Sequence, residues 1–285
     1  MYYFYFIIVF IFGLAFGSFI NALIYRQKTS KKITGRSKCP KCKHQLGVLD
    51  LIPIFSYVFL RGKCRYCGKA ISIEYPLVEL ATGLIFALNF FIIFPSFSSL
   101  ILTFDFSTMA KLILYLFYST ILIIIFIYDA KYGLILNKVI TTGIVIASFV
   151  WLVITGLYFL GHSTFVYEFY PISTSTPYNP ILIVLGAVLA SSLFFLLVFF
   201  SKEKLMGAGD IKLGLFMGLI LGFPQVIFAL LFSFVSGSII GILLILFEKK
   251  TFKSTLPFAP FLVFGTFIML FWGQIILNWY LKLLG

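Results

Sequence analysis

Charged side chains are scarce in this sequence, and acidic ones are the scarcest. Only 11% of the 285 residues are charged, with 9 Asp and Glu against 22 Lys and Arg, while 61% are hydrophobic. The mean hydropathy is +1.10, whereas a typical soluble domain carries roughly 25% charged residues. The shortage excludes an ordinary soluble domain and predicts an all-α protein that crosses the membrane several times.

Histidine is the second shortage. The chain has only His44 and His162, which fall in segments predicted on opposite sides of the membrane, and it offers no Ser/His/Asp set. This argues against a histidine-dependent nucleophile and against a catalytic zinc ion. The sequence also lacks a Gly-rich nucleotide-binding loop, so no residue pattern predicts a nucleotide-like cofactor.

Long apolar segments are abundant instead. A helix needs about 20 apolar residues to cross a bilayer, and we expect about eight such helices, although the sixth segment is short. Their predicted ranges are 2–24, 75–94, 109–128, 138–160, 181–200, 210–223, 225–247 and 257–280. The expected organisation is a first helix at 1–25, a small cytoplasmic loop domain at 26–74 and a membrane core at 75–285.

The basic residues predict the orientation. No Lys or Arg precedes the first apolar segment, and Arg26 follows it, so we expect a retained helix with its N-terminus outside. Counting crossings from there, all Lys and Arg except Lys111 and Lys282 lie in or beside predicted cytoplasmic segments. Those segments are 25–74, 129–137, 201–209 and 248–256. Most of the net charge of +13 falls in the first, which we expect to lie against anionic lipid rather than nucleic acid, because it has no aromatic platform for bases.

All four cysteines lie in the loop domain, as two C-x-x-C pairs: Cys39, Cys42, Cys64 and Cys67. This spacing predicts a structural zinc site, since four thiolates leave no open position for water. The predicted cytoplasmic location disfavours disulfides, and a redox role is the weaker alternative because the pair occurs twice. We expect His44 to be solvated rather than a further ligand.

A carboxylate stands at the start of the sixth apolar segment, in Met206-Gly207-Ala208-Gly209-Asp210. The two glycines allow backbone angles closed to other residues and a close backbone approach, and Asp210 alone could be a helix N-cap. Glycines recur at every fourth residue behind it, so we expect the acid to face a close helix contact rather than lipid. These glycines are Gly214, Gly218 and Gly222.

Asp129 ends the third apolar segment at the same predicted membrane face as Asp210. Alone it could pair with Lys131 in solvent. Two carboxyl groups in a poorly solvated site share a proton, so that one activates water while the other protonates or polarises a peptide carbonyl. The pair therefore predicts aspartic protease chemistry. A proton-coupled transporter that relays protons through Asp129 and Asp210 is the alternative from another class. It explains neither the four cysteines nor the placement of both acids at one membrane face. A non-catalytic scaffold would leave the two aspartates without a function.

The first helix and the second apolar segment carry further polar residues. Gly13 and Gly17 predict close approach of another helix, and the nearby Ser18 and Asn21 are expected to serve packing. Glu79 lies about one turn inside its apolar segment. It is equally a functional candidate or a favourable charge near a helix N-terminus.

Over nearly its full length the chain resembles the bacterial type 4 prepilin leader peptidases, which are polytopic GxGD aspartic proteases. The resemblance rests on several stretches together, and GAGD alone is similar to presenilin-type intramembrane proteases as well. The stretches are GSFINALIYR at 17–26, CPKCKHQL at 39–46, DLIPIFSYVFLRGKCRYCGKAIS at 50–72, YPLVELATGLIF at 75–86, MGAGDIKL at 206–213 and LPFAPFL at 256–262.

The resemblance implies a multi-pass protein of the bacterial inner membrane in which Asp129 and Asp210 are catalytic and the four cysteines bind zinc. It implies cleavage of type IV prepilins or pseudopilins after a Gly at the cytoplasmic face and, in many members, methylation of the new N-terminus from S-adenosylmethionine. The family often has Pro where Leu136 stands and Gly where Ala259 stands, which affects local backbone shape.

Prepilin leaders are basic, which fits poorly with a basic loop. We therefore hypothesise that Asp50, Glu74 and Glu79 form a local acidic path that docks the leader while the lysines contact lipid. Charge reversal at Glu79 is then expected to raise the apparent KM.

Overall fold

The computed structural model describes residues 2–29, 35–95, 106–161, 179–202, 206–247 and 256–284. Helices dominate these residues, and the described part contains no strand, only the isolated bridges Lys38–Gln45 and Lys63–Ala70. The expected all-α class is therefore confirmed. His162 and residues 248–255 of the last predicted cytoplasmic segment lie outside the described residues.

All eight predicted apolar segments form helices. The elements are α1 (Tyr2–Lys28), η1 (Val48–Leu51), α2 (Phe55–Phe59), α3 (Glu74–Ile93), α5 (Phe106–Tyr132), α6 (Asn137–Phe159), α8 (Pro180–Ser201), α9 (Ala208–Leu221), α10 (Gln225–Leu246) and α11 (Ala259–Leu284). Among the described residues, seven helices are long and apolar enough to cross a membrane. The exception is the 14-residue α9, which is about 21 Å long and shorter than the hydrocarbon core of about 30 Å.

The chain divides into two compact units, Met1–Thr120 and Ile121–Gly285, with the boundary inside α5. Each unit contains one of the two predicted sites. The three-part division at 1–25, 26–74 and 75–285 follows membrane segments rather than packing and stays a prediction.

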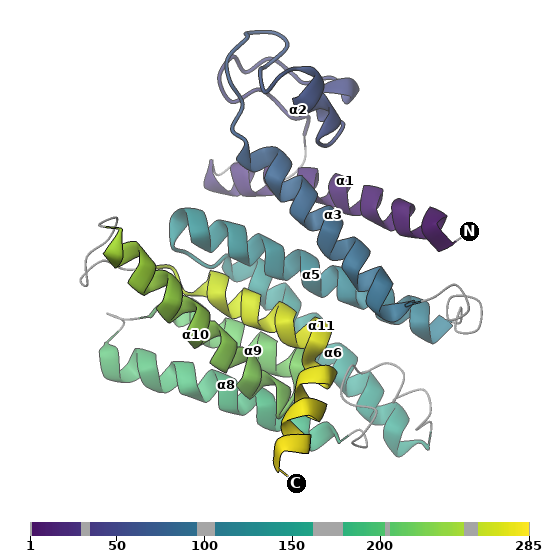
Figure 1. Cartoon of the computed structure of the whole chain (residues 1–285), viewed down its shortest axis with the longest axis vertical. Helices are drawn as coiled ribbons and strands as arrows, with labels where there is room; N and C mark the ends of the chain where they lie inside the picture. The colour runs from purple at the N-terminus through teal and green to yellow at the C-terminus, as the bar shows by residue number, and fades with distance from the viewer. Residues whose placement is uncertain are drawn as a thin grey trace. The chain divides into compact units, whose positions relative to one another are not determined.

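In the first unit, α1 and α3 cross and pack closely (Figure 1). A Cβ atom added to Gly13 would lie 2.8 Å from Cα of Gly83, and one added to Gly17 would lie 2.6 Å from Cα of Glu79. Only glycine allows two helix backbones to approach this closely. The prediction that Gly13 and Gly17 receive another helix is confirmed, and the contact fixes Glu79 against α1.

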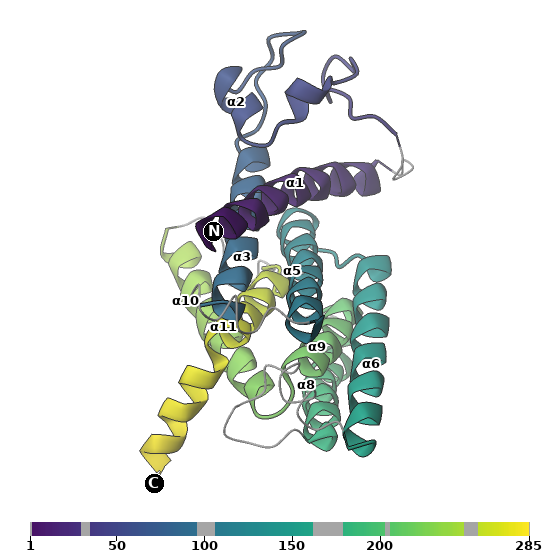
Figure 2. The ribbon, with the colours of Figure 1, turned by 90° about the vertical axis from the view of Figure 1, so that its right-hand side faces the viewer.

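In the second unit, the short helix α9 lies among α8, α6, α10 and α11 (Figures 1 and 2). Its predicted glycine face packs against α8: a Cβ atom on Gly214 would lie 3.0 Å from the carbonyl oxygen of Ala190, and one on Gly218 would overlap the backbone of Ala187. Gly222 ends the helix at φ +71°, and Phe223 N–H donates to the carbonyl of Leu182 at 2.9 Å. The close helix contact predicted for this face is confirmed.

Candidate active site and metal centre

Asp129 lies in the last turn of α5, which ends where Gly133 takes a left-handed conformation at φ +63° and donates its N–H to the Asp129 carbonyl at 2.8 Å. The Asp129 side chain is buried, with 6% of the residue exposed. Its Oδ2 accepts a 3.2 Å hydrogen bond from the backbone N–H of Ala259. Ala259 begins α11, where a helix leaves its first N–H groups without intrahelical partners. The start of one helix thus holds a carboxylate at the end of another.

Asp210 is the third residue of α9 and is 9% exposed. The N-cap is Gly207, three residues before Asp210. The Asp210 side chain, in the first turn, instead accepts a hydrogen bond from the Gly207 N–H. Neither Gly207 nor Gly209 has a positive φ, so the start of α9 does not use the backbone angles that only glycine allows. A Cβ atom on Gly209 would lie 3.0 Å from Cβ of Ile135, so that glycine makes room for a side chain.

The structure brings the two aspartates together in the second unit. Their carboxyl groups are close enough for their charges to interact, although they are 81 positions apart in sequence. Both are buried; Asp210 lies in the first turn of α9, whereas the side chain of Asp129, at the end of α5, contacts the N-terminus of α11. Helix N-termini stabilise negative charge, whereas burial and mutual repulsion oppose it. Such a pair can share a proton and act as acid and base.

Lys212 is a neighbour that sequence reasoning missed. Its Nζ donates a 2.8 Å hydrogen bond to Oδ1 of Asn137, which links α9 to the first residue of α6. The signal was present in the sequence, because Lys212 is a charged side chain two positions beyond Asp210 inside an apolar segment.

The first unit contains the cysteine cluster. The Sγ atoms of Cys39, Cys42, Cys64 and Cys67 all lie within 4.8 Å of one another. Four thiolates at such distances fit a tetrahedral metal site, so the cluster could hold a metal ion as the spacing predicts. His44 is exposed and stacks on Tyr66, with ring centroids 3.7 Å apart, and it is not part of the cluster.

The two C-x-x-C pairs have the same backbone geometry. Cys39 N–H donates to the carbonyl of His44 and Cys64 N–H to that of Lys69, both at 2.9 Å. The residue after the second cysteine of each pair is left-handed, Lys43 at φ 59° and Gly68 at φ 66°. Each pair is therefore a tight knuckle that points both of its sulfur atoms to one side.

The environment of Cys39 suits a metal-bound thiolate. Burial of the thiol raises its pKa, but the backbone N–H groups of Cys42 and Lys41 lower it, and the net result is a pKa of about 7. Metals bind the deprotonated form. The donor set and these N–H groups therefore fit a tetrahedral metal ion such as zinc.

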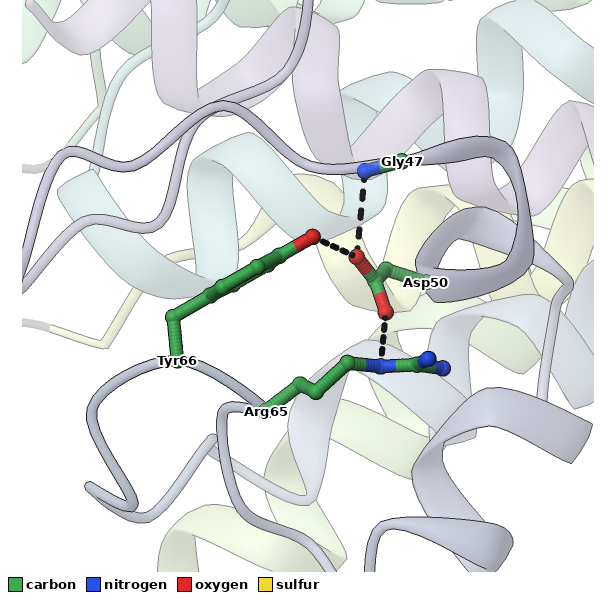
Figure 3. Close-up of polar contacts among 4 residues, drawn as sticks. All are labelled: Gly47, Asp50, Arg65 and Tyr66. Atoms are coloured by element: carbon green, nitrogen blue, oxygen red, sulfur yellow. Dashed lines mark hydrogen bonds and ion pairs between the residues drawn. The ribbon is translucent and has the colours of Figure 1, made fainter.

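Asp50 joins the two knuckles (Figure 3). Its Oδ2 accepts hydrogen bonds from the Gly47 N–H at 3.0 Å and the Tyr66 hydroxyl at 3.2 Å, and its Oδ1 lies 2.8 Å from Nε of Arg65. Gly47 follows the first knuckle, whereas Arg65 and Tyr66 lie inside the second. The Asp50 carboxylate therefore links the two knuckles within residues 39–67, which we call the cysteine module.

The other two acids of the predicted docking path lie in α3. Glu79 is only 8% exposed, and its Oε2 accepts a 2.8 Å hydrogen bond from the Ile54 N–H. Glu74 is exposed in the first turn of the helix. Leader docking by Asp50, Glu74 and Glu79 stays a prediction, with Asp50 and Glu79 engaged in internal hydrogen bonds.

Comparison with known proteins covers both units. The profile of the Bacterial Peptidase A24 N-terminal domain matches residues 11–93, and that of the Type IV leader peptidase family matches residues 116–242. A curated protein of Legionella pneumophila named "Prepilin leader peptidase/N-methyltransferase" is 30% identical over 98% of this chain and 95% of its own length. Proteins of the same name from Aeromonas salmonicida (strain A449) and Bacillus subtilis (strain 168) are each 29% identical, over 98% and 97% of this chain and 94% and 98% of their own lengths. No solved structure matches the chain.

Proposed function

The chain belongs to the type IV leader peptidase family, and we propose that it cleaves the basic leader from type IV prepilins or pseudopilins after a Gly residue, with Asp129 and Asp210 as the catalytic pair. The observation that carries this proposal is the burial of two interacting carboxyl groups at helix ends. Membrane burial alone would disfavour both acids. The burial of both carboxyl groups in the same unit fits a shared catalytic task.

In the proposed reaction the two aspartates share one proton. The ionised carboxylate takes a proton from a water molecule as its oxygen attacks the carbonyl carbon of the scissile peptide bond. The protonated carboxyl group donates its proton to the carbonyl oxygen. Protonation of the amide nitrogen and cleavage of the C–N bond then release the leader and leave a new amino terminus on the pilin.

The backbone N–H of Ala259 helps to position the Asp129 carboxyl group for this reaction. It holds Oδ2 of Asp129, which leaves the other oxygen of that carboxyl group available for water or substrate. A carboxylate held by a fixed donor loses less orientational freedom when the reaction begins. We therefore assign Ala259 a positioning role.

We further propose that the enzyme methylates the new amino terminus with S-adenosylmethionine, because its relatives are named for both activities. When bound, that cofactor would supply an electrophilic methyl group to the new amine. The Cys39, Cys42, Cys64 and Cys67 thiolates would hold a structural zinc ion that fixes the module fold.

The proposed setting is the bacterial inner membrane, with the N-terminus outside and both the cysteine module and the aspartates at the cytoplasmic face. This orientation is supported by the concentration of Lys and Arg in 26–69. It gives the peptidase access to the leader of a prepilin whose hydrophobic segment is still in the bilayer.

The test is cleavage of a purified prepilin by the wild-type enzyme and by Asp129→Asn and Asp210→Asn in detergent or proteoliposomes. Both amide variants keep the side-chain size but cannot share a proton between two carboxyl groups, so each is expected to reduce kcat by at least about 1,000-fold. Ser192→Ala in α8 changes a hydroxyl that bonds to a carbonyl of its own helix. It is the control for effects of expressing and purifying a membrane-protein variant. A folded Asn variant that cleaves at the wild-type rate would remove that residue from the pair.

A further inference from the structure

Residues 48–59 of the cysteine module have the opposite polarity to a loop that lies in water. Every exposed residue in this stretch is apolar, whereas its polar side chains are partly covered. Val48 and Phe59 are 85% and 83% exposed. The exposed residues are Val48, Leu49, Leu51, Ile52, Phe55, Val58 and Phe59. A concentration of exposed apolar side chains such as this one marks a contact surface for a membrane or a partner.

The polar side chains of the stretch point inward. A cavity of about 700 Å³ lies within the first unit, between the cysteine module and the adjoining ends of α1 and α3, and is lined in part by Asp50, Ser56 and Tyr57. Of the exposed apolar residues only Leu51 belongs to this lining, and we call the other six the apolar patch. The helices η1 and α2, which carry most of the patch, contact each other. The stretch therefore has a polar inner side and an apolar outer side.

The stretch is tied to a membrane-spanning helix. In its middle, Ile54 donates its N–H to Oε2 of Glu79 at 2.8 Å. Glu79, which also lines the cavity, is the sixth residue of α3 and so lies roughly 7 Å along the helix axis. Because α3 is long and apolar enough to cross a membrane, the contact holds the stretch at the second turn of a spanning helix rather than far beyond its end.

The start of α3 continues the apolar surface. Ile73, Leu77 and Leu80 are exposed, and their spacing of four and three residues places them on one face of the helix. On a helix that crosses the membrane, such a face contacts lipid. The patch and this face thus belong to the same end of the same unit, and one lipid surface can cover both.

Basic residues flank the stretch on both sides. Those that are exposed next to it are Lys41, Lys43, Arg61 and Lys63. Basic residues beside an apolar segment are attracted to anionic lipid headgroups. The hydrophobic segment of a prepilin is another apolar surface, but the basic leader attached to it would be repelled by these residues. The charges therefore favour lipid over the substrate as the occupant of the patch.

We propose that the apolar patch inserts into the interfacial region of the bilayer and anchors the cysteine module to the membrane, with the flanking basic residues on anionic headgroups. Segments of this kind bury their apolar side chains roughly 5–10 Å into the boundary between headgroups and acyl chains. The attachment of Ile54 to the second turn of α3 is compatible with that depth. The anchor goes beyond the proposed cleavage reaction and does not depend on it.

The test places a tryptophan in the patch of the full-length enzyme, reconstituted in vesicles that contain anionic lipid. Trp151, Trp272 and Trp279 are first replaced by Phe, and Phe59→Trp then supplies the tryptophan emission. We expect lipids brominated on their acyl chains to quench this emission at least about twofold, and aqueous iodide to quench it weakly. Phe55→Trp gives a second position in the patch with the same expectation.

His44→Trp in the same background is the matched control. His44 is exposed in the cysteine module but lies outside the patch, and tryptophan keeps a ring that can stack on Tyr66. We expect its emission to be quenched by iodide more than by brominated lipid. Prepilin cleavage is measured on each preparation, so that failure of the anchor and failure of the peptidase are separate results.

Two outcomes for the Phe59→Trp emission would overturn the anchor. One is strong quenching by iodide with no effect of brominated lipid. The other is quenching by iodide that disappears only when prepilin is added, which would assign the patch to the substrate. In vesicles of zwitterionic lipid alone we expect weaker quenching by brominated lipid, since the basic residues lose their partners; equal quenching in both kinds of vesicle would overturn the part assigned to the basic residues.

Discussion

The carboxylate of Asp129 accepts a hydrogen bond from the backbone N–H of Ala259, which lies 130 residues later in the chain. The bond joins the last turn of α5 to the first residue of α11. Since the side chain of Ala259 takes no part in the hydrogen bond, a substitution that keeps the backbone N–H can keep the bond. Proline, which has no N–H, removes it.

Ala259→Pro removes this donor and is therefore expected to lower kcat for prepilin cleavage by about 10- to 100-fold, the equivalent of a hydrogen bond to a charged group. Proline is well tolerated at the first position of a helix, so α11 is expected to form. Ala259→Gly keeps the N–H and serves as the control. Equal kcat values for the two variants in a cleavage assay would show that the hydrogen bond is dispensable.

Zinc is expected to bind to the cysteine module in a ratio of one ion per chain, measured by atomic emission on the purified protein. Cys67→Ser replaces one thiolate with a weaker ligand and is expected to lower zinc retention during dialysis against a chelator. Ser233→Ala in α10 provides a control outside the module. Full zinc retention by the Cys67 variant, or two disulfides in place of free thiols, would contradict the site.

Gly68 is expected to be the more sensitive of two glycines in the module. Gly68 is left-handed at φ 66° and has nothing within 4 Å of an added Cβ atom. Gly68→Ala therefore causes no steric clash, and its only cost is the backbone strain of a left-handed alanine, about 1 kcal/mol of folding free energy. This corresponds to roughly a fivefold loss of zinc affinity. Gly47→Ala, at φ −77°, is the control and is expected to change the affinity little; equal effects in a zinc competition titration would rule out the conformational explanation.

Asp50→Ala is expected to destabilise the cysteine module by about 1–3 kcal/mol, because it leaves the Gly47 N–H and the Tyr66 hydroxyl without their acceptor. Arg65→Gln is expected to cost less than about 1 kcal/mol, since the Arg65 side chain is 48% exposed and the ion pair is screened by water. Zinc release on heating measures both. A larger loss for the arginine variant would mean that charge, rather than hydrogen bonding, holds the knuckles together.

Gly218→Ala tests the packing of α9 on α8. The added methyl group overlaps the backbone of Ala187, which cannot move aside as a flexible side chain could, so we expect a loss of about 1–3 kcal/mol. Gly241→Ala in α10 is the control, since nothing lies within 4 Å of its added Cβ atom. Thermal unfolding in detergent should show a lower transition temperature for the α9 variant alone.

Much of this molecule was predictable because its signals are local. The spacing of Cys39, Cys42, Cys64 and Cys67 specifies the knuckles, and Gly13 and Gly17 mark a close helix contact, since each pattern depends on a few neighbouring residues. The apolar segments specify the helices for the same reason.

The missed features depend on distant parts of the chain or on small shifts in helix ends. Ala259 has an ordinary side chain, and its role follows from where α11 begins and from what α5 brings to that point. The N-cap at Gly207 differs from the expected Asp210 by three residues, which is enough to change the role of the carboxyl group. The cavity beside Glu79 forms only where separate segments of the chain meet, and no pattern within one segment predicts it.

The brevity of α9 makes the position of Asp210 depend on protein packing rather than on bilayer thickness. A helix about 21 Å long cannot have both ends at the surfaces of a hydrocarbon layer of about 30 Å, and its far end turns at Gly222 with Phe223 hydrogen-bonded to Leu182 of α8, so the turn is satisfied by protein. The helices α8, α6, α10 and α11 surround α9, and most of its residues from Leu213 onward are buried, so protein rather than lipid encloses its far end. The position of Asp210 is thus set by packing against α8 and not by a match between the length of α9 and the thickness of the bilayer.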